Sequence, residues 1–485
     1  MKLSIEPRTR SIITFVFFLS LGISLHAQVN NTLYYMQGVP QSNRVNPAYQ
    51  PQCQFYIGIP FLSPIRTDLS SSSLAWEDVV YHNPVQPDSL ITFLHPQGSK
   101  EAFLNKLKPV NRVISDLGTS MISVGFRTSV GFFTLDVISR WDGNIYYPGD
   151  LAKLLITGSG EGETYNLDGV GADLTAFNEI SAGWSGEILD NLTIGAKAKV
   201  LFGIGNLSTM NSDLSLTTSQ DNWRIQSDMR INASIPFAEV TYDDEGMIED
   251  IVLDENLENP TYSSISKYMF NGKNLGFGVD LGVDYRPIEK LHISLSLLDL
   301  GYIRWKDEVH QADYRMEYDF PGFELNPFDL SEEYTFQDYL DSSVNQLADS
   351  LAGFLEITPG IIYSKRLNTK LYVGASYDVT PNINFGVLSR TDFLKGKVSE
   401  QVTASANFRA GRVLNLTLSY SYMNSYFKNI GAGISLNAGP VNLYLISDNA
   451  LNVLFWPEEA RSANLWFGFN LMFGYRDKPD LPLVQ

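Results

Sequence analysis

The stretch Arg412–Tyr422, RVLNLTLSYSY, alternates between apolar and small polar residues from Leu414 onward. Successive side chains of a β-strand point to opposite faces, so the pattern predicts a strand with one apolar and one polar face. The same alternation recurs in NLTIGAKAKV (191–200), LGFGVDLGVDY (275–285), NIGAGISLNA (429–438) and NLWFGFNLMFGY (464–475). A pattern repeated over most of the chain predicts an all-β protein.

Two environments produce this alternation: the core of a soluble β-sandwich, and a membrane barrel whose apolar face meets lipid. The polar faces here are rich in Gly, Ser, Thr and Asn, which suits a crowded barrel interior better than open water. The strands are about ten residues long, enough for a tilted crossing of a bilayer. Aromatic residues gather near strand ends, as in 420–427, where a membrane interface favours them. The sequence therefore favours the barrel, with the exported soluble sandwich as the alternative.

The number of strands follows from loop placement. About sixteen candidate strands can be found, with long connections at about 62–118, 141–177, 236–273, 305–355 and 449–460. Long loops of such barrels lie outside, so an even number of crossings must separate consecutive long loops. Parity holds if 191–235 is one crossing with an external extension and 356–378 is one long strand. The prediction is a transmembrane antiparallel β-barrel of about 14 strands with long, partly helical extracellular loops, such as a helix within 335–354.

The N-terminus has the features of a secretory signal peptide. Lys2, Arg8 and Arg10 precede an apolar run at 11–25, and LHAQ offers cleavage after Ala27. A retained membrane anchor is the alternative. The predicted organisation is a signal peptide at 1–27, a periplasmic or hatch segment at 28–52, an outer-membrane barrel at 53–476 and a periplasmic tail at 477–485.

The segment SNRVNPAYQP (42–51) precedes the first predicted strand. Pro47 and Pro51 cannot donate to a strand ladder, so they keep the segment out of the sheet. Asn46 is pushed to an extended conformation by the following proline, which leaves its amide free to bond loop backbone. Asn46, Pro47, Ala48 and Tyr49 are therefore the candidate hatch motif, expected to pack into the periplasmic mouth. An ordinary turn that positions the first strand is the alternative.

No catalytic, cofactor-binding or metal-binding residues are predicted. The formal net charge of −19 argues against nucleic acid as a partner, and a single cysteine, Cys53, allows no internal disulfide. His292, beside Ser294 and Ser296 on a polar strand face, is the best residue for a lumenal hydrolase, but it is expected to be a lining residue. Asp280 and Asp284 are expected to pair with Lys197 and Lys199 in the interior rather than to form an acid–base set.

The signal ending in HAQ, the NPAYQP motif and the final FNLMFGY strand resemble outer-membrane barrel proteins of the Bacteroidota. The chain is similar to the PorP/SprF-like proteins, which carry an NPAYAG-type signature, or to a related uncharacterised family. It is more distantly similar to FadL/PorV-type barrels. Asn46, Pro47, Ala48 and Tyr49 match the signature, and Gln50-Pro51 departs from it.

The resemblance implies a non-enzymatic protein of the cell outer membrane that serves secretion or surface assembly, associated with type IX secretion or gliding. The alternatives are a FadL-like transporter of apolar small molecules and an outer-membrane barrel enzyme such as a lipid hydrolase. The expected partners are outer-membrane lipid and secretion or surface-assembly proteins, without cofactors.

Overall fold

The computed structural model describes residues 31–36, 38–219, 222–242, 248–254, 261–320, 350, 354–394, 397–423, 426–455 and 460–475. The predicted signal peptide at 1–27 and the predicted tail at 477–485 lie outside these residues. Most of the helix expected within 335–354 also lies outside them.

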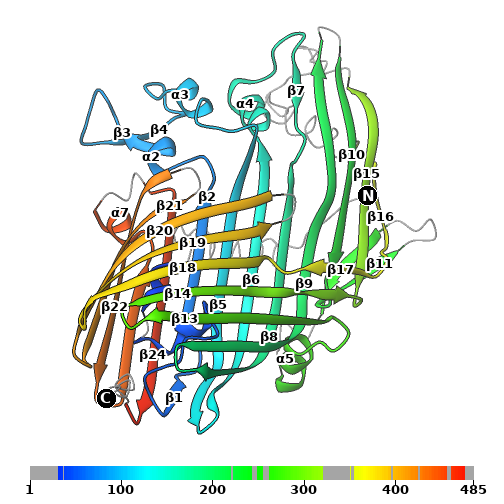
Figure 1. Cartoon of the computed structure of the whole chain (residues 1–485). Coiled ribbons are helices and arrows are strands. Elements are labelled where there is room, and N and C mark those ends of the chain that lie inside the picture. The colour runs from blue at the N-terminus through cyan, green and yellow to red at the C-terminus, as the bar shows by residue number, and fades with distance from the viewer. Residues whose placement is uncertain are drawn as a thin grey trace, which may run out of the picture.

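An antiparallel barrel of 14 crossings forms the body of the protein (Figure 1). In wall order the strands are β1 (Phe55–Gly58) continued by β2 (Ile65–Ser71), β5 (Val110–Thr128), β6 (Gly131–Pro148), β8 (Gly171–Leu189), β9 (Leu192–Thr218), β13 (Leu275–Ile288), β14 (Leu291–Trp305), β17 (Tyr363–Arg366) continued by β18 (Thr369–Thr380), β19 (Ile383–Leu394), β20 (Lys397–Ala410), β21 (Leu414–Met423), β22 (Tyr426–Ala438), β23 (Val441–Ser447) and β24 (Ser462–Phe473). The last strand, β24, pairs with both β1 and β2 and closes the wall. The predicted fold class is confirmed.

Exposure follows the predicted alternation. On β21, Leu418 is 58% exposed and Tyr420 is 50% exposed, whereas Thr417 and Ser419 are 3% exposed. Apolar side chains therefore face outward, and Ser, Thr and Asn side chains line the lumen. An exposed apolar belt around a closed sheet is the surface that a bilayer covers, so this barrel belongs in the outer membrane.

One side of the wall continues past the barrel as a ribbon. Residues 192–202 of β9 pair with β13, but residues 206–218 pair with β10 (Trp223–Ser234), which pairs with β15 (Val309–Phe320) and then β16 (Leu355–Pro359). Figure 1 shows β9, β10 and β15 rising beyond the neighbouring strands. We call β10, β15, β16 and this part of β9 the ribbon. The predicted extension within 191–235 is confirmed, and most of 356–378 belongs to one crossing.

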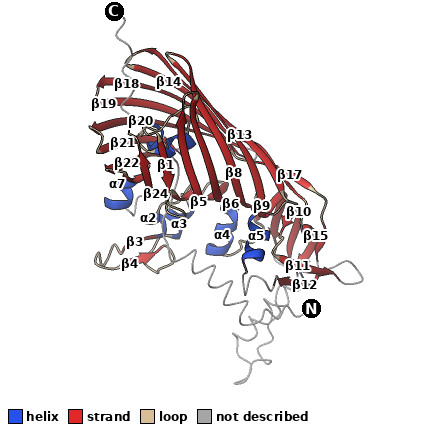
Figure 2. Ribbon diagram, turned by 90° about the horizontal axis from the view of Figure 1, so that it is seen from below, coloured by secondary structure: helices blue, strands red, loops and turns tan. Residues whose placement is uncertain are grey.

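The remaining elements lie in the connections. They are β3 (Val80–His82), β4 (Leu90–Thr92), β7 (Thr164–Asn166), β11 (Ala238–Tyr242), β12 (Ile248–Leu253), α2 (Trp76–Val79), α3 (Lys100–Leu104), α4 (Gly149–Thr157), α5 (Tyr262–Met269) and α7 (Ala450–Phe455). Figure 2 shows α2, α3, α4 and the β3–β4 hairpin beside the strand ends rather than in the wall. By the general rule for such barrels, the end with these long connections faces outward, and we call it the outer end.

The bounds expected for the first long connection, 62–118, were wrong. The first crossing continues as β2 to Ser71, and β5 begins at Val110. Pro60 and Pro64 interrupt the first crossing, and Phe61 between them has a φ of 61°. Proline removes ladder donors, so the break hides the strand pattern that continues beyond it.

No helix in the described part of the chain is long and apolar enough to span a membrane. The described residues also contain no group of His, Cys, Asp and Glu side chains arranged to hold a metal ion.

Candidate functional site

The chain ahead of the first strand lies inside the barrel. We call its described part, residues 31–36 and 38–52, the lumenal segment. It contains two short 3-10 helices, η1 (Thr32–Tyr35) and η2 (Pro40–Arg44). Proline opens η2, where its missing N–H costs nothing. Leu33, Tyr34 and Val39 have no exposed surface, so the lumenal segment forms an apolar cluster inside the barrel together with wall residues such as Tyr372 and Trp466.

The leading end of the lumenal segment is bound to a carboxylate. Asp448, just after β23, accepts hydrogen bonds from the backbone N–H groups of Thr32, at 2.6 Å, and Asn31, at 3.2 Å. The side chain of Asn464 also donates to Asp448, at 2.9 Å. Burial raises the pKa of Asp448 to about 6, and these donors only partly offset the loss of hydration.

Two tyrosines anchor the middle of the lumenal segment. The Tyr34 ring stacks on Tyr372 of β18 with the ring centroids 5.4 Å apart, and its hydroxyl donates to Ser294 of β14. The Tyr35 hydroxyl lies 2.6 Å from the carbonyl of Val387 on β19. Aromatic rings with bonded hydroxyls supply both apolar contact and direction, so these two residues fix the segment against three strands.

The candidate hatch motif forms a turn against β13. The Asn46 side-chain oxygen accepts a hydrogen bond from the N–H of Ala48 at 3.0 Å, and its amide donates to the carbonyl of Val283 at 3.2 Å. The Tyr49 N–H donates to the carbonyl of Asn46 at 2.9 Å, so Pro47 lies inside a closed turn. Asn46 has no exposed surface, and Ala48 and Tyr49 are buried. The amide of Asn46 thus bonds the backbone of a wall strand, and the expectation that it would bond loop backbone was wrong.

Glycines of the wall make room for this turn. A Cβ at Gly282 of β13 would overlap the Asn46 side-chain oxygen, and one at Gly195 of β9 would overlap the Pro47 carbonyl. Further along the lumenal segment, Gly386 faces Tyr35 and Gly433 faces Met36 at similarly close range. We call Gly195, Gly282, Gly386 and Gly433 the glycine seat. Close backbone approach is a recognised reason for glycine within strands.

A buried ion pair joins the lumenal segment to the wall. The guanidinium of Arg44 lies 2.7 Å from Asp136 of β6, and Lys197 of β9 lies 3.3 Å from the same carboxylate. Ser123 also donates to Asp136 at 2.8 Å. The carboxylate of Asp136 therefore serves two cations, and only Arg44 belongs to the lumenal segment.

The other residues singled out from the sequence lie in the lumen. Lys199 lies 2.8 Å from Asp280, so this predicted pair is confirmed, whereas Lys197 pairs with Asp136 and Asp284 lies near Arg286. His292 is a buried lining residue between two carboxylates, 3.6 Å from Asp284 and 3.3 Å from Asp378. Ser294 accepts a hydrogen bond from the Tyr34 hydroxyl, and Ser296 donates one to the Val45 carbonyl. Both serines near His292 are therefore hydrogen-bonded to the lumenal segment.

Sequence reasoning missed Arg44, Asp136 and Asp448, which nothing local distinguishes from other charged residues. The glycine seat did leave a signal, because Gly195, Gly282 and Gly433 interrupt the polar faces of predicted strands. The placement of the hatch motif at the periplasmic mouth stays a prediction, and Asn31, earlier in the chain, reaches Gln401 and Thr403 of β20.

The space on the two sides of the lumenal segment is unequal. Toward the end with short turns, a cavity of about 880 Å³ is lined by Gln50, Arg127, Arg286, Arg412 and other residues. Toward the outer end, the cavity beside Arg44 holds only about 60 Å³, enough for a few water molecules. Among the described residues, the lumenal segment and the side chains on its outer side therefore leave little space in the lumen beside Arg44.

A family model described as "Family of unknown function (DUF5723)" matches residues 47–448. No curated protein matches the sequence.

Several solved structures are similar in fold. The Ralstonia pickettii toluene transporter TbuX has a TM-score of 0.40 and 9% identity, covering 90% of this chain and 94% of its own. A Pseudomonas aeruginosa FadL homologue has a TM-score of 0.37 and 9% identity, covering 93% and 97%. The CymD monoaromatic hydrocarbon channel has a TM-score of 0.38 and 9% identity, covering 94% and 96%. The distant similarity to FadL-type barrels is thus found, and at this level it concerns the fold alone.

Proposed function

The chain belongs to the family described as DUF5723, of unknown function, and from this premise we propose that it is a gated outer-membrane transport protein. Its lumenal segment is the gate, with Asn46, Pro47, Ala48 and Tyr49 as the hatch motif. The protein is non-enzymatic, and small molecules cross when the segment leaves the glycine seat.

The occupied lumen is the observation that carries this proposal. At several points the wall meets the segment with glycine, or with serine and asparagine side chains that hydrogen-bond it, beside the apolar contacts of Tyr34 and its neighbours. The hydrogen-bonded contacts exchange their partners for water when the segment leaves, so this part of its attachment costs less to release than its apolar contacts do. A barrel whose lumen is occupied by a segment that can leave is suited to gated transport of small molecules.

Conductance across a planar lipid bilayer tests the proposal. The wild-type protein should remain closed most of the time, and the Gly195→Ala/Gly282→Ala variant should open, because each added methyl group overlaps the hatch motif. Gly278→Ala is the matched control, since a Cβ there lies 3.5 Å from the nearest atom, the Lys199 Cδ. A double variant that folds and stays as closed as the control would overturn the proposal.

A role in secretion or surface assembly, including type IX secretion or gliding, is the second candidate. The ribbon favours it, because a sheet that continues past the barrel offers cell-surface area that small-molecule passage does not need. We expect charge-reversing changes on the ribbon, such as Arg224→Glu with Asp319→Lys, to reduce display of surface proteins without changing conductance. Unchanged surface display would remove this candidate.

A further inference from the structure

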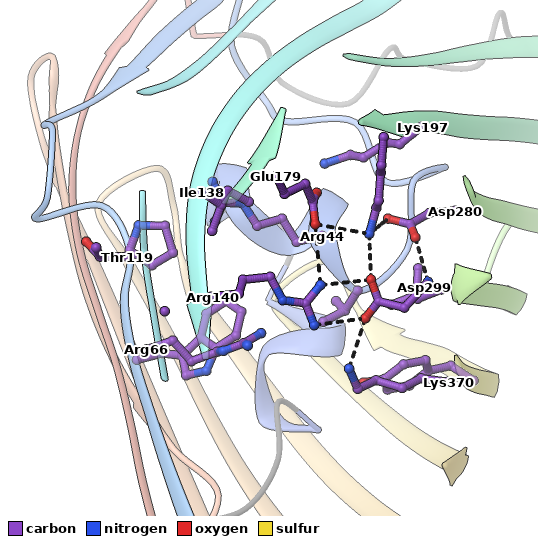
Figure 3. A pocket seen from close by; sticks show the side chains of 17 residues that line it. Arg44, Arg66, Thr119, Ile138, Arg140, Glu179, Lys197, Asp280, Asp299 and Lys370 are labelled. Atoms are coloured by element: carbon purple, nitrogen blue, oxygen red, sulfur yellow. Dashed lines mark hydrogen bonds and ion pairs between the residues drawn. The ribbon is translucent and has the colours of Figure 1, made fainter. Parts of the chain in front are cut away.

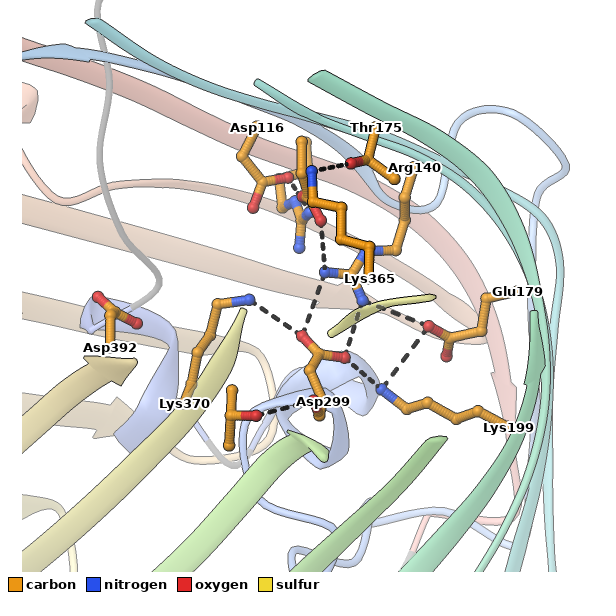
Figure 4. A network of polar contacts seen from close by, with 12 residues as sticks. Asp116, Arg140, Thr175, Glu179, Lys199, Asp299, Lys365, Lys370 and Asp392 are labelled. Carbon is orange, nitrogen blue, oxygen red and sulfur yellow. Dashed lines mark hydrogen bonds and ion pairs between the residues drawn. The ribbon is translucent and has the colours of Figure 1, made fainter. Parts of the chain in front are cut away.

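Charged side chains from opposite walls meet in the lumen on the outer side of the lumenal segment (Figure 4). The carboxylate of Asp299, on β14, lies 2.9 Å from Arg140 of β6 and 2.7 Å from Lys199 of β9. Lys370 of β18 lies 3.0 Å from it. Arg140, Lys199 and Asp299 are buried, and Lys370 is partly exposed. We call these four residues, with Glu179 and Asp280, the Asp299 cluster.

A bulge in the wall projects Asp299 inward. The pairing of β13 with β14 shifts register between Val279 and Leu281, and Asp299 on the opposite strand has a φ of 57°. The Asp299 N–H donates to the side chain of Asp280 at 2.7 Å. Bulges re-aim side chains, and a positive φ is uncommon for residues other than glycine. The backbone here is therefore shaped to hold this carboxylate in the lumen.

The pair between Arg140 and Asp299 crosses the lumen rather than following the wall. Along the wall, β8, β9 and β13 lie between β6 and β14. Two further contacts cross in the same way: Lys365 of β17 pairs with Asp173 of β8, and the Tyr363 hydroxyl donates to Asn206 of β9 at 2.7 Å. These contacts place charged and polar side chains in the path of a solute that moves along the lumen.

Most of the residues that line the cavity between the lumenal segment and the Asp299 cluster have charged side chains (Figure 3). Arg44, Arg66, Arg140, Lys197, Lys199 and Lys370 supply the cations, and Glu179, Asp280 and Asp299 supply the carboxylates. Separating a buried ion pair costs several kcal/mol per ion unless new partners replace the old ones. A hydrocarbon offers no such partners.

We infer that the solute this barrel passes is a small hydrophilic zwitterion of the amino-acid type, rather than a hydrocarbon. Opening the Arg140–Asp299 pair loosens a carboxylate that three cations share and a guanidinium that also lies near Glu179. A solute that carries both signs can pair with the carboxylate through its ammonium group and with the guanidinium through its own carboxylate. This inference rests on the proposed transport function, and it differs from the cargo named for the toluene and hydrocarbon channels.

Uptake into proteoliposomes tests the inference with two isomers of equal size. Glycine is a zwitterion, and glycolamide is neutral. In vesicles that hold the full-length Gly195→Ala/Gly282→Ala protein, we expect glycine to enter about tenfold faster, which corresponds to about 1.4 kcal/mol. Saturating toluene should not slow glycine uptake, and vesicles without protein report any leak that toluene causes.

A second variant ties selectivity to the Asp299 cluster. Asp299→Asn in the open background should bring the two uptake rates to within about twofold of each other, because three cations lose their shared carboxylate. Asp319→Asn, which removes the partner of Arg224 on the ribbon, is the matched control and should keep the preference. Should Asp299→Asn fail to fold, Asp299→Glu keeps the charge and should retain a weakened preference.

The outcomes separate the inference from the function on which it rests. Equal uptake of both isomers, or inhibition by toluene, overturns the inference and leaves the transport function standing. Uptake of neither isomer, with the double variant folded, overturns the transport function itself.

Discussion

At the scale of single residues, we expect the loss of Asp136 to lower the free energy of unfolding more than the loss of its partner Arg44. Asp136 is shared by Arg44 and Lys197, so removing it leaves two buried cations side by side, whereas removing Arg44 leaves a neutral pair. Breaking a buried ion pair by deleting one partner typically costs about 3–5 kcal/mol. The two partners are therefore not equivalent.

We expect Asp136→Asn to lower the free energy of unfolding by about 3 kcal/mol and Arg44→Gln by about 1 kcal/mol. Urea unfolding in lipid vesicles, followed by tryptophan fluorescence, measures both. Equal losses would contradict the shared role of Asp136.

The carboxyl group of Asp448 makes stability depend on pH. Its pKa is raised to about 6 by burial, so the folded state holds the proton at pH values where the unfolded chain has released it. Stability from this group is therefore greatest in acid and is lost as pH rises through about 6. We expect wild type to lose about 1 kcal/mol between pH 5 and pH 7.5, relative to Asp448→Asn.

Thermal unfolding of both proteins at the two pH values measures this difference. Asp319→Asn, an exposed ribbon position, should retain the wild-type dependence. An Asp448→Asn protein with the same dependence would assign the titration to another group.

At the scale of elements, the lumenal segment should be lockable in place. Thr32 Oγ1 and Ser419 Oγ lie 2.7 Å apart, so these two side chains point toward one another and are the pair chosen for a disulfide. In a Cys53→Ser background, we expect Thr32→Cys/Ser419→Cys to form that bond on oxidation and to close the Gly195→Ala/Gly282→Ala variant.

Bilayer conductance before and after reduction measures the effect of this lock, and the single Thr32→Cys variant is the control. A disulfide that forms without lowering conductance would show that solutes pass beside a seated segment.

Strands such as 414–422 could be predicted from the sequence because alternation is local to each strand. The break between β1 and β2 could not, since Pro60 and Pro64 erase the pattern there. The contacts of the lumenal segment could not be predicted from the sequence either. Arg44 and Asp136 are far apart in the chain, as are Thr32 and Asp448, and no repeating sequence pattern marks either pair. The NPAY motif indicated a candidate site, but it did not indicate which wall residues contact that site.

At the scale of the whole molecule, closure depends on the pairing of the two chain ends. Deleting Ser462–Phe473 removes the strand that bonds both β1 and β2, so we expect loss of the compact form that migrates faster in unboiled gel samples. Deleting 80–92, which includes the β3–β4 hairpin outside the wall, is the control and should keep that form. A heat-sensitive compact band without β24 would contradict the observed closure.

The seam between β24 and the first crossing also sets an order of assembly. Its partners are separated by about 400 residues, so forming it carries the greatest loop-closure cost of any pairing in the wall. The lumenal segment precedes the first strand and occupies the lumen. The wall glycines have no side chains that could fill this space. We expect the wall to close around the lumenal segment during folding. The segment that obstructs the finished barrel would then also set the width of its lumen.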